Sequence, residues 1–171
     1  MTPVDGACLI LGGARSGKSA FAEAMCKASG RRMIYLATGR SFDGEMDDRI
    51  AQHRTRRGPD WTLVEEPVEL TGALASNSAP DTVVLVDCLT LWLTNLMLAD
   101  RAVDMEADAM VEALDPAVSI IFVSNEVGQG IVPDNAMARA FRDHAGRLHQ
   151  RLAAKIPNVW FVTAGLPQKL K

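Results

Sequence analysis

The chain has few cysteines, no excess of positive charge and no long apolar run, and each absence argues against a class of protein. Its three cysteines, Cys8, Cys26 and Cys88, lack the number and spacing of a disulfide framework or a zinc site, so we expect small buried hydrophobic side chains. A formal net charge of −3 argues against a general nucleic-acid binder. The longest apolar stretch, "CLTLWLTNLML", is too short to span a bilayer, which predicts no membrane insertion.

Two further features are missing from the sequence. The N-terminal stretch "MTPVDGACLIL" has no basic lead of the kind that opens a signal peptide, so we expect a cytoplasmic protein. No linker, repeat or low-complexity tract is visible between residues 1 and 171, which predicts a single domain. A domain of this length can bury about 68–70% of the surface of its unfolded chain.

What is present is an alternation of short apolar runs with helical patterns. The runs that predict strands cover residues 7–11, 33–37, 82–87, 119–124 and 158–164, with a weaker candidate at 61–66. They are almost continuously apolar, as expected for parallel strands with helices on both faces. Helices are predicted over residues 17–28, 42–57, 68–76, 88–99, 104–114 and 135–155. This order predicts an α/β domain with a doubly wound, mostly parallel sheet flanked by helices. Together with the phosphate-binding motif described below, the expected class is P-loop NTPase-like (RecA-like).

The predicted helix over residues 135–155 carries an apolar stripe at helical spacing. The stripe consists of Met137, Phe141, Ala145, Leu148 and Leu152. Side chains at this spacing lie on one face of a helix, so we expect the whole stripe to face the sheet.

The first strand is followed by the stretch "GGARSGKS", which has the spacing of a phosphate-binding P-loop. Its residues are Gly12, Gly13, Ala14, Arg15, Ser16, Gly17, Lys18 and Ser19. Glycines let the backbone curl so that its N–H groups point at phosphate oxygens, and the following helix presents its positive end to the same anion. Lys18 can then reach the terminal phosphates, and the Ser19 hydroxyl can bind Mg²⁺. The sequence therefore predicts binding of a nucleoside triphosphate.

Asp87 closes the strand run "TVVLVD", at a strand end that faces the same crevice as the P-loop. It could bind Mg²⁺, directly or through water, or hold a ribose hydroxyl. Alternatively, it could cap the helix that follows. No Asn-Lys-x-Asp stretch is present, so a Ras-like switch is not expected, and the P-loop alone leaves the reaction open.

His53 lies on the apolar face of the predicted helix over 42–57, in line with Met46 and Ile50 and directly before "RTRR". A structural role is the usual one for a histidine on such a face. Arginines, however, stabilise phosphoryl charge, and a neutral imidazole beside them is a competent nucleophile toward phosphorus. The residues alone therefore indicate a P-loop enzyme in which His53 could carry a phosphoryl or nucleotidyl group.

The motifs together resemble a known family. The stretches "GGARSGKS", "YLATG", "EMDDRIAQHRTRR", "VDCLTLWLTN" and "SNEVGQGIVPDNAMARAFRDHAGRLHQRLA" are similar, in this order, to the bifunctional adenosylcobinamide kinase / adenosylcobinamide-phosphate guanylyltransferase family. The resemblance implies that a nucleoside triphosphate, ATP or GTP, phosphorylates adenosylcobinamide. It also implies that GTP then delivers GMP through a histidine to adenosylcobinamide-phosphate, which gives adenosylcobinamide-GDP.

The resemblance also implies roles for particular residues. The guanylylated histidine corresponds to His53, because Gln52 occupies the place of the second histidine that some members carry. The nucleotide site would comprise the P-loop with Ala37, Thr38, Gly39, Arg54, Thr55, Arg56, Arg57, Glu65 and Asp87. Glu65 has the adjacent Glu66 as a rival for its role. The family also implies a homotrimer.

Other interpretations stay open at this point. The chain could be a simple small-molecule P-loop kinase, an NTP-hydrolysing regulatory or motor protein, or a guanylyltransferase without the kinase step. Asn125 and Glu126 could touch substrate or brace a subunit contact, and His144 and His149 are expected at the surface or its boundary. Trp92 is expected in the core or in a subunit interface.

Overall fold

The computed structural model describes residues 6–39 and 59–171, and a seven-stranded sheet lies at its centre. The strand order is β3-β2-β4-β5-β1-β6-β7. The strands are β1 (Cys8–Gly12), β2 (Arg32–Ala37), β3 (Trp61–Glu65), β4 (Thr82–Asp87), β5 (Ile120–Asn125), β6 (Asn158–Thr163) and β7 (Leu166–Lys169). The helices are α1 (Lys18–Ala28), α3 (Leu70–Asn77), α4 (Leu89–Leu98), α5 (Val103–Ala113) and α6 (Ala136–Lys155).

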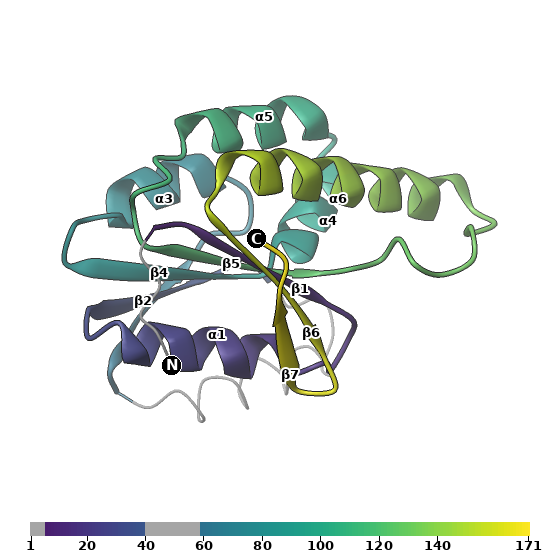
Figure 1. Ribbon diagram of the computed structural model, residues 1–171. Helices are drawn as coiled ribbons and strands as arrows, with labels where there is room; N and C mark the ends of the chain where they lie inside the picture. Colours follow the sequence, from purple (N-terminus) through teal and green to yellow (C-terminus); the bar gives the residue numbers. More distant parts are fainter. Residues whose placement is uncertain (1–5, 40–58) are drawn as a thin grey trace.

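Helices cover both faces of the sheet. Figure 1 shows α1 on one face and α3, α4, α5 and α6 on the other. Along β1 the side chains alternate between the two layers: Leu9 packs in the cluster with α3 to α6, whereas Cys8 and Ile10 pack in the cluster with α1. Burial on both sides explains why the strand sequences are continuously apolar rather than alternating. The strands β1 to β6 pair in parallel, so the predicted doubly wound, mostly parallel, P-loop NTPase-like fold is confirmed.

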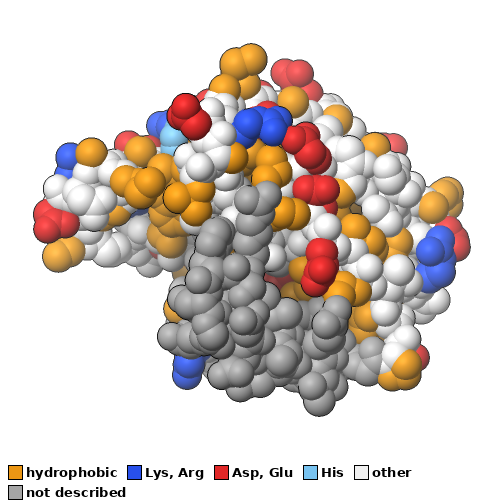
Figure 2. Space-filling view, turned by 180° about the vertical axis from the view of Figure 1, so that it is seen from behind, with side chains coloured by type: hydrophobic (Ala, Val, Ile, Leu, Met, Phe, Trp, Pro, Cys, Tyr) orange, Lys and Arg blue, Asp and Glu red, His pale blue; other side chains and the backbone are white. Residues whose placement is uncertain are grey.

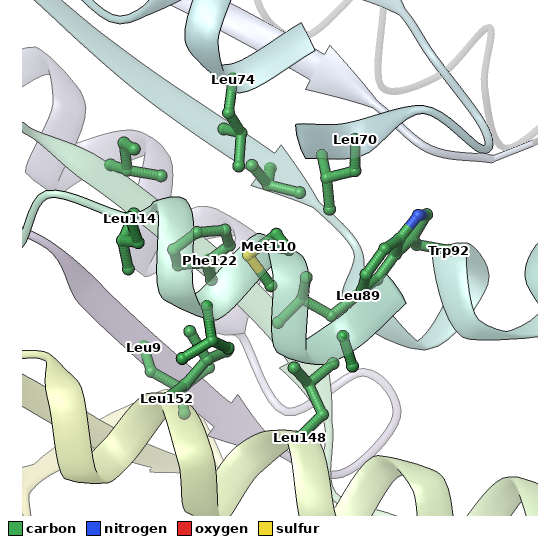
Figure 3. Close-up of a cluster of buried hydrophobic side chains, with 14 of the residues drawn as sticks. Leu9, Leu70, Leu74, Leu89, Trp92, Met110, Leu114, Phe122, Leu148 and Leu152 are labelled. Carbon is green, nitrogen blue, oxygen red and sulfur yellow. The ribbon is translucent and has the colours of Figure 1, made fainter. Parts of the chain in front are cut away.

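The larger cluster lies under the four helices of one face (Figure 3). Its labelled members are Leu9 and Phe122 from the sheet, Leu70 and Leu74 from α3, Leu89 and Trp92 from α4, Met110 and Leu114 from or beside α5, and Leu148 and Leu152 from α6. Trp92 is fully buried there, so its place is the core.

The predicted strands and helices are confirmed to within two residues at their ends in the part of the chain that the structure describes. The helix predicted over residues 42–57 lies outside the described residues. One strand was not predicted, β7, which pairs antiparallel with β6 at the sheet edge. Its sequence "LPQK" is exposed and contains proline, which is tolerated at an edge. Ala164 and Gly165, with φ 52° and 78°, form the tight turn of this hairpin.

The predicted stripe on α6 is correct except at its N-terminal end. Ala145, Leu148 and Leu152 are fully buried, and Phe141 is partly buried, but Met137 is 59% exposed. A helix of 20 residues spans about 30 Å, whereas a six-residue strand spans about 20 Å. The N-terminal half of α6 therefore projects beyond the sheet, as Figure 1 shows.

The projecting part of α6 and the loop before it carry exposed apolar side chains. Ile131 is 95% exposed, Val132 70% and Met137 59%, and Figure 2 shows hydrophobic side chains gathered on this part of the surface. Arg142 donates to the carbonyls of Gly128 and Ile131, which fixes the loop against the helix. In the described parts of the chain we find no helix with the length and apolarity needed to span a membrane.

The three cysteines are buried and unpaired, as the sequence predicts. Burial raises the pKa of Cys8 and Cys26 to about 12 and that of Cys88 to about 11. These thiols therefore stay protonated at neutral pH and act as small hydrophobic side chains.

The expectation that His149 lies at the surface or its boundary is wrong. His149 is 8% exposed, and its Nε2 lies 2.7 Å from the hydroxyl of the fully buried Ser124 on β5. Burial lowers the pKa of His149 from 6.5 to about 4, and the nearby Glu126 carboxylate opposes this shift. The helical period had placed His149 next to the apolar stripe, but only the packing of α6 on β5 shows that it is enclosed. His144 is partly exposed and lies 3.4 Å from Asp104.

We expect the buried imidazole to make stability depend on pH. Because the folded state disfavours protonation, the unfolded chain binds more protons between the two pKa values. The contribution is present above pH 6.5 and is lost as the pH falls toward 4, by about 3 kcal/mol in total. The test compares the urea unfolding free energy of wild type and His149→Gln from pH 7 to pH 4. The wild type should lose stability faster, and parallel curves would contradict the assignment.

Candidate active site

The P-loop links the end of β1 to the start of α1, and the backbone requires glycine at Gly12 and Gly17. Gly12 has φ 152°, and a Cβ there would lie 2.3 Å from the carbonyl oxygen of Val162. Gly17 has φ 100°, and a Cβ there would lie 3.0 Å from Cα of Gly165. The Gly165 N–H also donates to the Ser16 carbonyl at 2.8 Å. The β6–β7 hairpin thus holds the curled loop from outside.

Lys18 is folded back onto the loop that it follows. Its side chain is largely buried, at 7% exposed for the residue, and Nζ donates to the Gly13 carbonyl at 2.6 Å. Burial lowers the pKa of Lys18, while Cys88 and Asp87 act in the opposite direction. The ammonium group is therefore held inside the loop, within the electrostatic reach of Asp87.

The start of α1 and the interior of the loop leave polar groups available to an anion. The N-cap is Gly17, which has no side chain to cap the helix, and no acidic residue lies in the first turn. The Ser16 hydroxyl is shielded from solvent and lacks a hydrogen-bond partner in the described part of the chain. Free N–H groups at a helix start favour negative charge. Together with Lys18 they make this loop a site suited to phosphate.

The neighbouring strands bring three other predicted residues into one row. Ala37 at the end of β2 is in register with Glu65 of β3 on one side and with Asp87 of β4 on the other. In a parallel sheet, strand ends that lie side by side form the edge at which ligands bind. The row lies at the same edge of the sheet as the P-loop, the edge formed by the carboxyl ends of the parallel strands. In the strand order β5 lies between β4, which carries Asp87, and β1, which leads into the loop.

Glu65 and Glu66 have different environments. The Glu66 carboxylate accepts hydrogen bonds from the N–H groups of Val68 and Glu69, each at 2.9 Å, at the start of α3. Glu65 is exposed at the strand end. The Glu66 carboxylate thus stabilises the backbone before α3, which favours Glu65 as the residue available to a ligand.

Asp87 is half-buried, and its carboxylate is held by a hydrogen bond from the neighbouring strand. The hydroxyl of Tyr35, on the neighbouring strand β2, donates to Asp87 Oδ2 at 2.8 Å. The alternative that Asp87 caps the next helix is wrong, because the N-cap of α4 is Cys88 and no side chain caps that helix. Sequence reasoning missed Tyr35, although the chain's one tyrosine in an otherwise aliphatic strand was a signal.

Thr38 points into the protein rather than into the crevice. Its side chain is fully buried, and its hydroxyl donates to the Cys88 carbonyl at 2.7 Å. Gly39 is half-buried, and a Cβ there would lie 3.3 Å from Leu91 Cδ1. Of the predicted stretch 37–39, the backbone rather than the Thr38 side chain is available at the sheet edge.

Asn125 and Glu126 follow β5, directly beside the P-loop. Asn125 is in register with Gly12, and its amide donates to Thr90 Oγ1 at 3.2 Å. The Glu126 N–H donates to the Gly12 carbonyl at 3.0 Å, and its carboxylate accepts from the N–H groups of Gly128 and Gln129. Glu126 therefore fixes the backbone at the start of the P-loop, whereas the Asn125 side chain links the end of β5 to α4.

Two groups of predicted residues remain to be placed. His53, Arg54, Thr55, Arg56 and Arg57 lie outside the described residues. Ser19 is half-buried in the first turn of α1. Across residues 6–39 and 59–171 no three His, Cys, Asp or Glu side chains gather as metal ligands. Mg²⁺ in nucleotide sites usually takes only one or two protein ligands beside phosphate and water, a pattern that Ser19 and Asp87 fit.

Comparison with known proteins gives matches along nearly the whole chain. The family model described as cobinamide kinase / cobinamide phosphate guanyltransferase matches residues 8–170. The bifunctional adenosylcobalamin biosynthesis protein CobP of Pseudomonas aeruginosa is 49% identical over 166 residues, with 95% of this chain and 96% of that protein covered. The bifunctional adenosylcobalamin biosynthesis protein CobU of Salmonella typhimurium is 39% identical over 180 residues, with 95% and 98% covered.

A solved structure shares the fold at low sequence identity. The P4 protein from bacteriophage phi6, in complex with ADP, matches with a TM-score of 0.51 and 15% identity. The match covers 97% of this chain and 55% of that one, so the chain spans just over half of the P4 protein. At this identity the likeness supports the fold alone.

Proposed function

Since the chain belongs to the cobinamide kinase / cobinamide phosphate guanyltransferase family, we propose that it performs both of these transfers in adenosylcobalamin biosynthesis. The family match over residues 8–170 is the observation that carries the proposal. The P-loop and the row of strand ends beside it supply a nucleotide site of the kind that both transfers need.

The first transfer is phosphorylation of adenosylcobinamide by ATP or GTP. The terminal hydroxyl oxygen of the aminopropanol arm attacks the γ-phosphorus, the bond to the β-phosphate oxygen breaks, and the hydroxyl proton is released. Charge develops on the phosphate oxygens, so residues that hold and neutralise them supply most of the catalysis. In this chain these are the loop N–H groups and Lys18, whose Nζ lies in the loop and donates to the Gly13 carbonyl.

The second transfer passes through His53. A ring nitrogen of the neutral imidazole attacks the α-phosphorus of GTP, and pyrophosphate leaves. A phosphate oxygen of adenosylcobinamide-phosphate then attacks the same phosphorus, and the phosphorus–nitrogen bond breaks to give adenosylcobinamide-GDP. Splitting the reaction in two is the advantage of a covalent carrier. Arg54, Arg56 and Arg57 would balance the phosphate charge, and Thr55 would complete this side of the site.

Mg²⁺ would be held by the Ser19 hydroxyl and the Asp87 carboxylate. The ion would neutralise phosphate charge during transfer. Ala37 and Gly39 would line the nucleotide site, and Glu65 and Asp87 would hold its ribose side. Thr38 would support this part of the site through its buried hydrogen bond to the Cys88 carbonyl.

Three further features are part of the proposal. The protein would be one domain over residues 1–171 and would act in the cytoplasm. It would assemble as a homotrimer, as the family resemblance implies. The apolar side chains of Ile131, Val132 and Met137 on the projecting loop and helix support an interface between subunits there.

The function is tested by incubating purified protein with adenosylcobinamide, Mg²⁺ and either ATP or GTP, followed by mass spectrometry of the corrinoid. A gain of one phosphate with either nucleotide, and of GMP only with GTP, is the expected result. Phosphorylation alone would indicate a simple kinase. Guanylylation of added adenosylcobinamide-phosphate alone would indicate a transferase without the kinase step. NTP hydrolysis without a corrinoid product would indicate a regulatory protein.

Tyr35→Phe is expected to weaken the use of Mg²⁺ without changing the fold. The variant keeps the buried ring and removes only the hydroxyl that orients Asp87. Loss of such a partner behind a metal ligand costs about tenfold in metal affinity or activity. The measurement is the Mg²⁺ dependence of GTP use, with Asp87→Ala as the reference for complete loss of the carboxylate. An unchanged Mg²⁺ dependence would contradict the role of this hydrogen bond.

A further inference from the structure

A buried amide lies beneath the row of strand ends that forms the nucleotide side of the site. Asn95 is 2% exposed and sits in α4, in the apolar sequence "LTLWLTNLML". Asparagine is a poor helix former, and a buried amide is costly unless its hydrogen bonds are satisfied. Its presence at this position calls for specific partners.

Both partners of Asn95 are backbone carbonyls just past the ends of strands. Its Nδ2 donates to the Thr38 carbonyl, after β2, at 2.6 Å and to the Pro67 carbonyl, after β3, at 3.0 Å. An amide nitrogen has two hydrogens, so these two bonds use its full donor capacity. One side chain thus ties two adjacent segments to α4.

Thr38 extends the same connection to the third strand end. Its hydroxyl donates to the Cys88 carbonyl at 2.7 Å, and its N–H donates to the Asp87 carbonyl at 3.3 Å. The segments that follow β2, β3 and β4 are therefore linked through Thr38 and Asn95. The residues one or two positions earlier are Ala37, Glu65 and Asp87, the row proposed to hold the nucleotide.

We infer that Asn95, acting through Thr38 and Pro67, is a positioning residue that holds Ala37, Glu65 and Asp87 in register for the nucleotide. It touches no substrate and acts by fixing the backbone from below. The inference rests on the proposed function for the identity of the ligand, a guanine nucleotide with Mg²⁺. It assigns a site-building role to a residue for which the residue pattern and the family resemblance gave none.

The test uses Asn95→Leu, which keeps the number and branching of the side-chain heavy atoms and removes both hydrogen bonds. The matched control is Asn77→Leu, because Asn77 Nδ2 also donates to a backbone carbonyl, that of Ala73, but at the C-terminal end of α3, next to the start of β4. We expect Asn95→Leu to bind GTP with Mg²⁺ about tenfold more weakly and Asn77→Leu to bind like wild type. Affinity is measured by calorimetry at a temperature at which thermal unfolding shows each protein folded.

A second measurement separates positioning from a general loss of stability. Tyr35 is the chain's one tyrosine, and its hydroxyl binds Asp87, so protein labelled with ¹³C at the tyrosine Cζ gives one resonance that reports on this strand end. That resonance should shift in free Asn95→Leu and stay in place in Asn77→Leu. A merely structural asparagine would lower the melting temperature and leave the resonance unchanged.

The outcomes distinguish the inference from the function on which it rests. Wild type that fails to bind GTP would overturn the proposed function. Wild type and a folded Asn95→Leu that bind GTP equally would overturn the inference alone. If Asn95→Leu does not fold, Thr38→Val replaces it, because that variant removes only the Thr38–Cys88 link at nearly constant volume. Weaker GTP binding by Thr38→Val supports the inference, and unchanged binding overturns it.

Discussion

Protein carrying His53→Ala is expected to take up no covalent label from GTP labelled at the α-phosphate, whereas wild type becomes labelled. Alanine has no nucleophile to attack the α-phosphorus, so the first half of GMP transfer cannot occur. Wild type should take no label from the γ-phosphate, because pyrophosphate leaves. A phosphorus–nitrogen bond also predicts a label that is lost in acid and retained in base. Transfer of GMP to adenosylcobinamide-phosphate should fall to background in the variant.

The structure supplies the controls for this experiment. The chain has three histidines, and His149 is buried with its Nε2 bound to Ser124. His144 lies on α6, where its Nδ1 faces Asp104 and Arg147, and His144→Ala should be labelled like wild type. Thermal unfolding and GTP binding establish that His53→Ala is folded. Label that persists in folded His53→Ala would refute the covalent role and return His53 to a structural one.

Lys18→Met is expected to reduce both transfers by about 10²–10³-fold in kcat/KM. Methionine fits the space of the buried lysine stem but has no charge for the β- and γ-phosphate oxygens. Because burial lowers the pKa of Lys18, the fold already bears a cost for holding this amine, so its removal should spare stability. The measurement is steady-state kinetics of phosphorylation and of GMP transfer, beside thermal unfolding.

Lys27→Met provides the matched control in the same helix. Lys27 is exposed in the last turn of α1, at the far end from the loop. The control should retain both activities. A loss confined to one transfer in Lys18→Met would mean that the two reactions do not share the P-loop. Equal losses would support one triphosphate site for both.

Much of the fold and part of the site could be predicted from local sequence. The spacing of Gly12, Gly17 and Lys18 after an apolar run predicts a phosphate loop because the features that make it are consecutive in the chain. The continuous apolar runs predict parallel strands, because a strand that is buried on both faces has apolar residues at consecutive positions. By contrast, β7 has no apolar run, and its pairing depends on the turn at Ala164 and Gly165.

The sequence by itself determined the nucleotide chemistry, the candidate carrier His53 and the family resemblance. The tertiary structure decided which polar groups support one another. The bonds from Tyr35 to Asp87 and from Asn95 to Thr38 join residues 52 and 57 positions apart. It also decided that Glu66 holds the turn before α3, that Thr38 points inward and that His149 is enclosed. Helical and strand periods report which face of an element a residue occupies. The partner that it meets depends on how distant elements pack, and no local pattern encodes that.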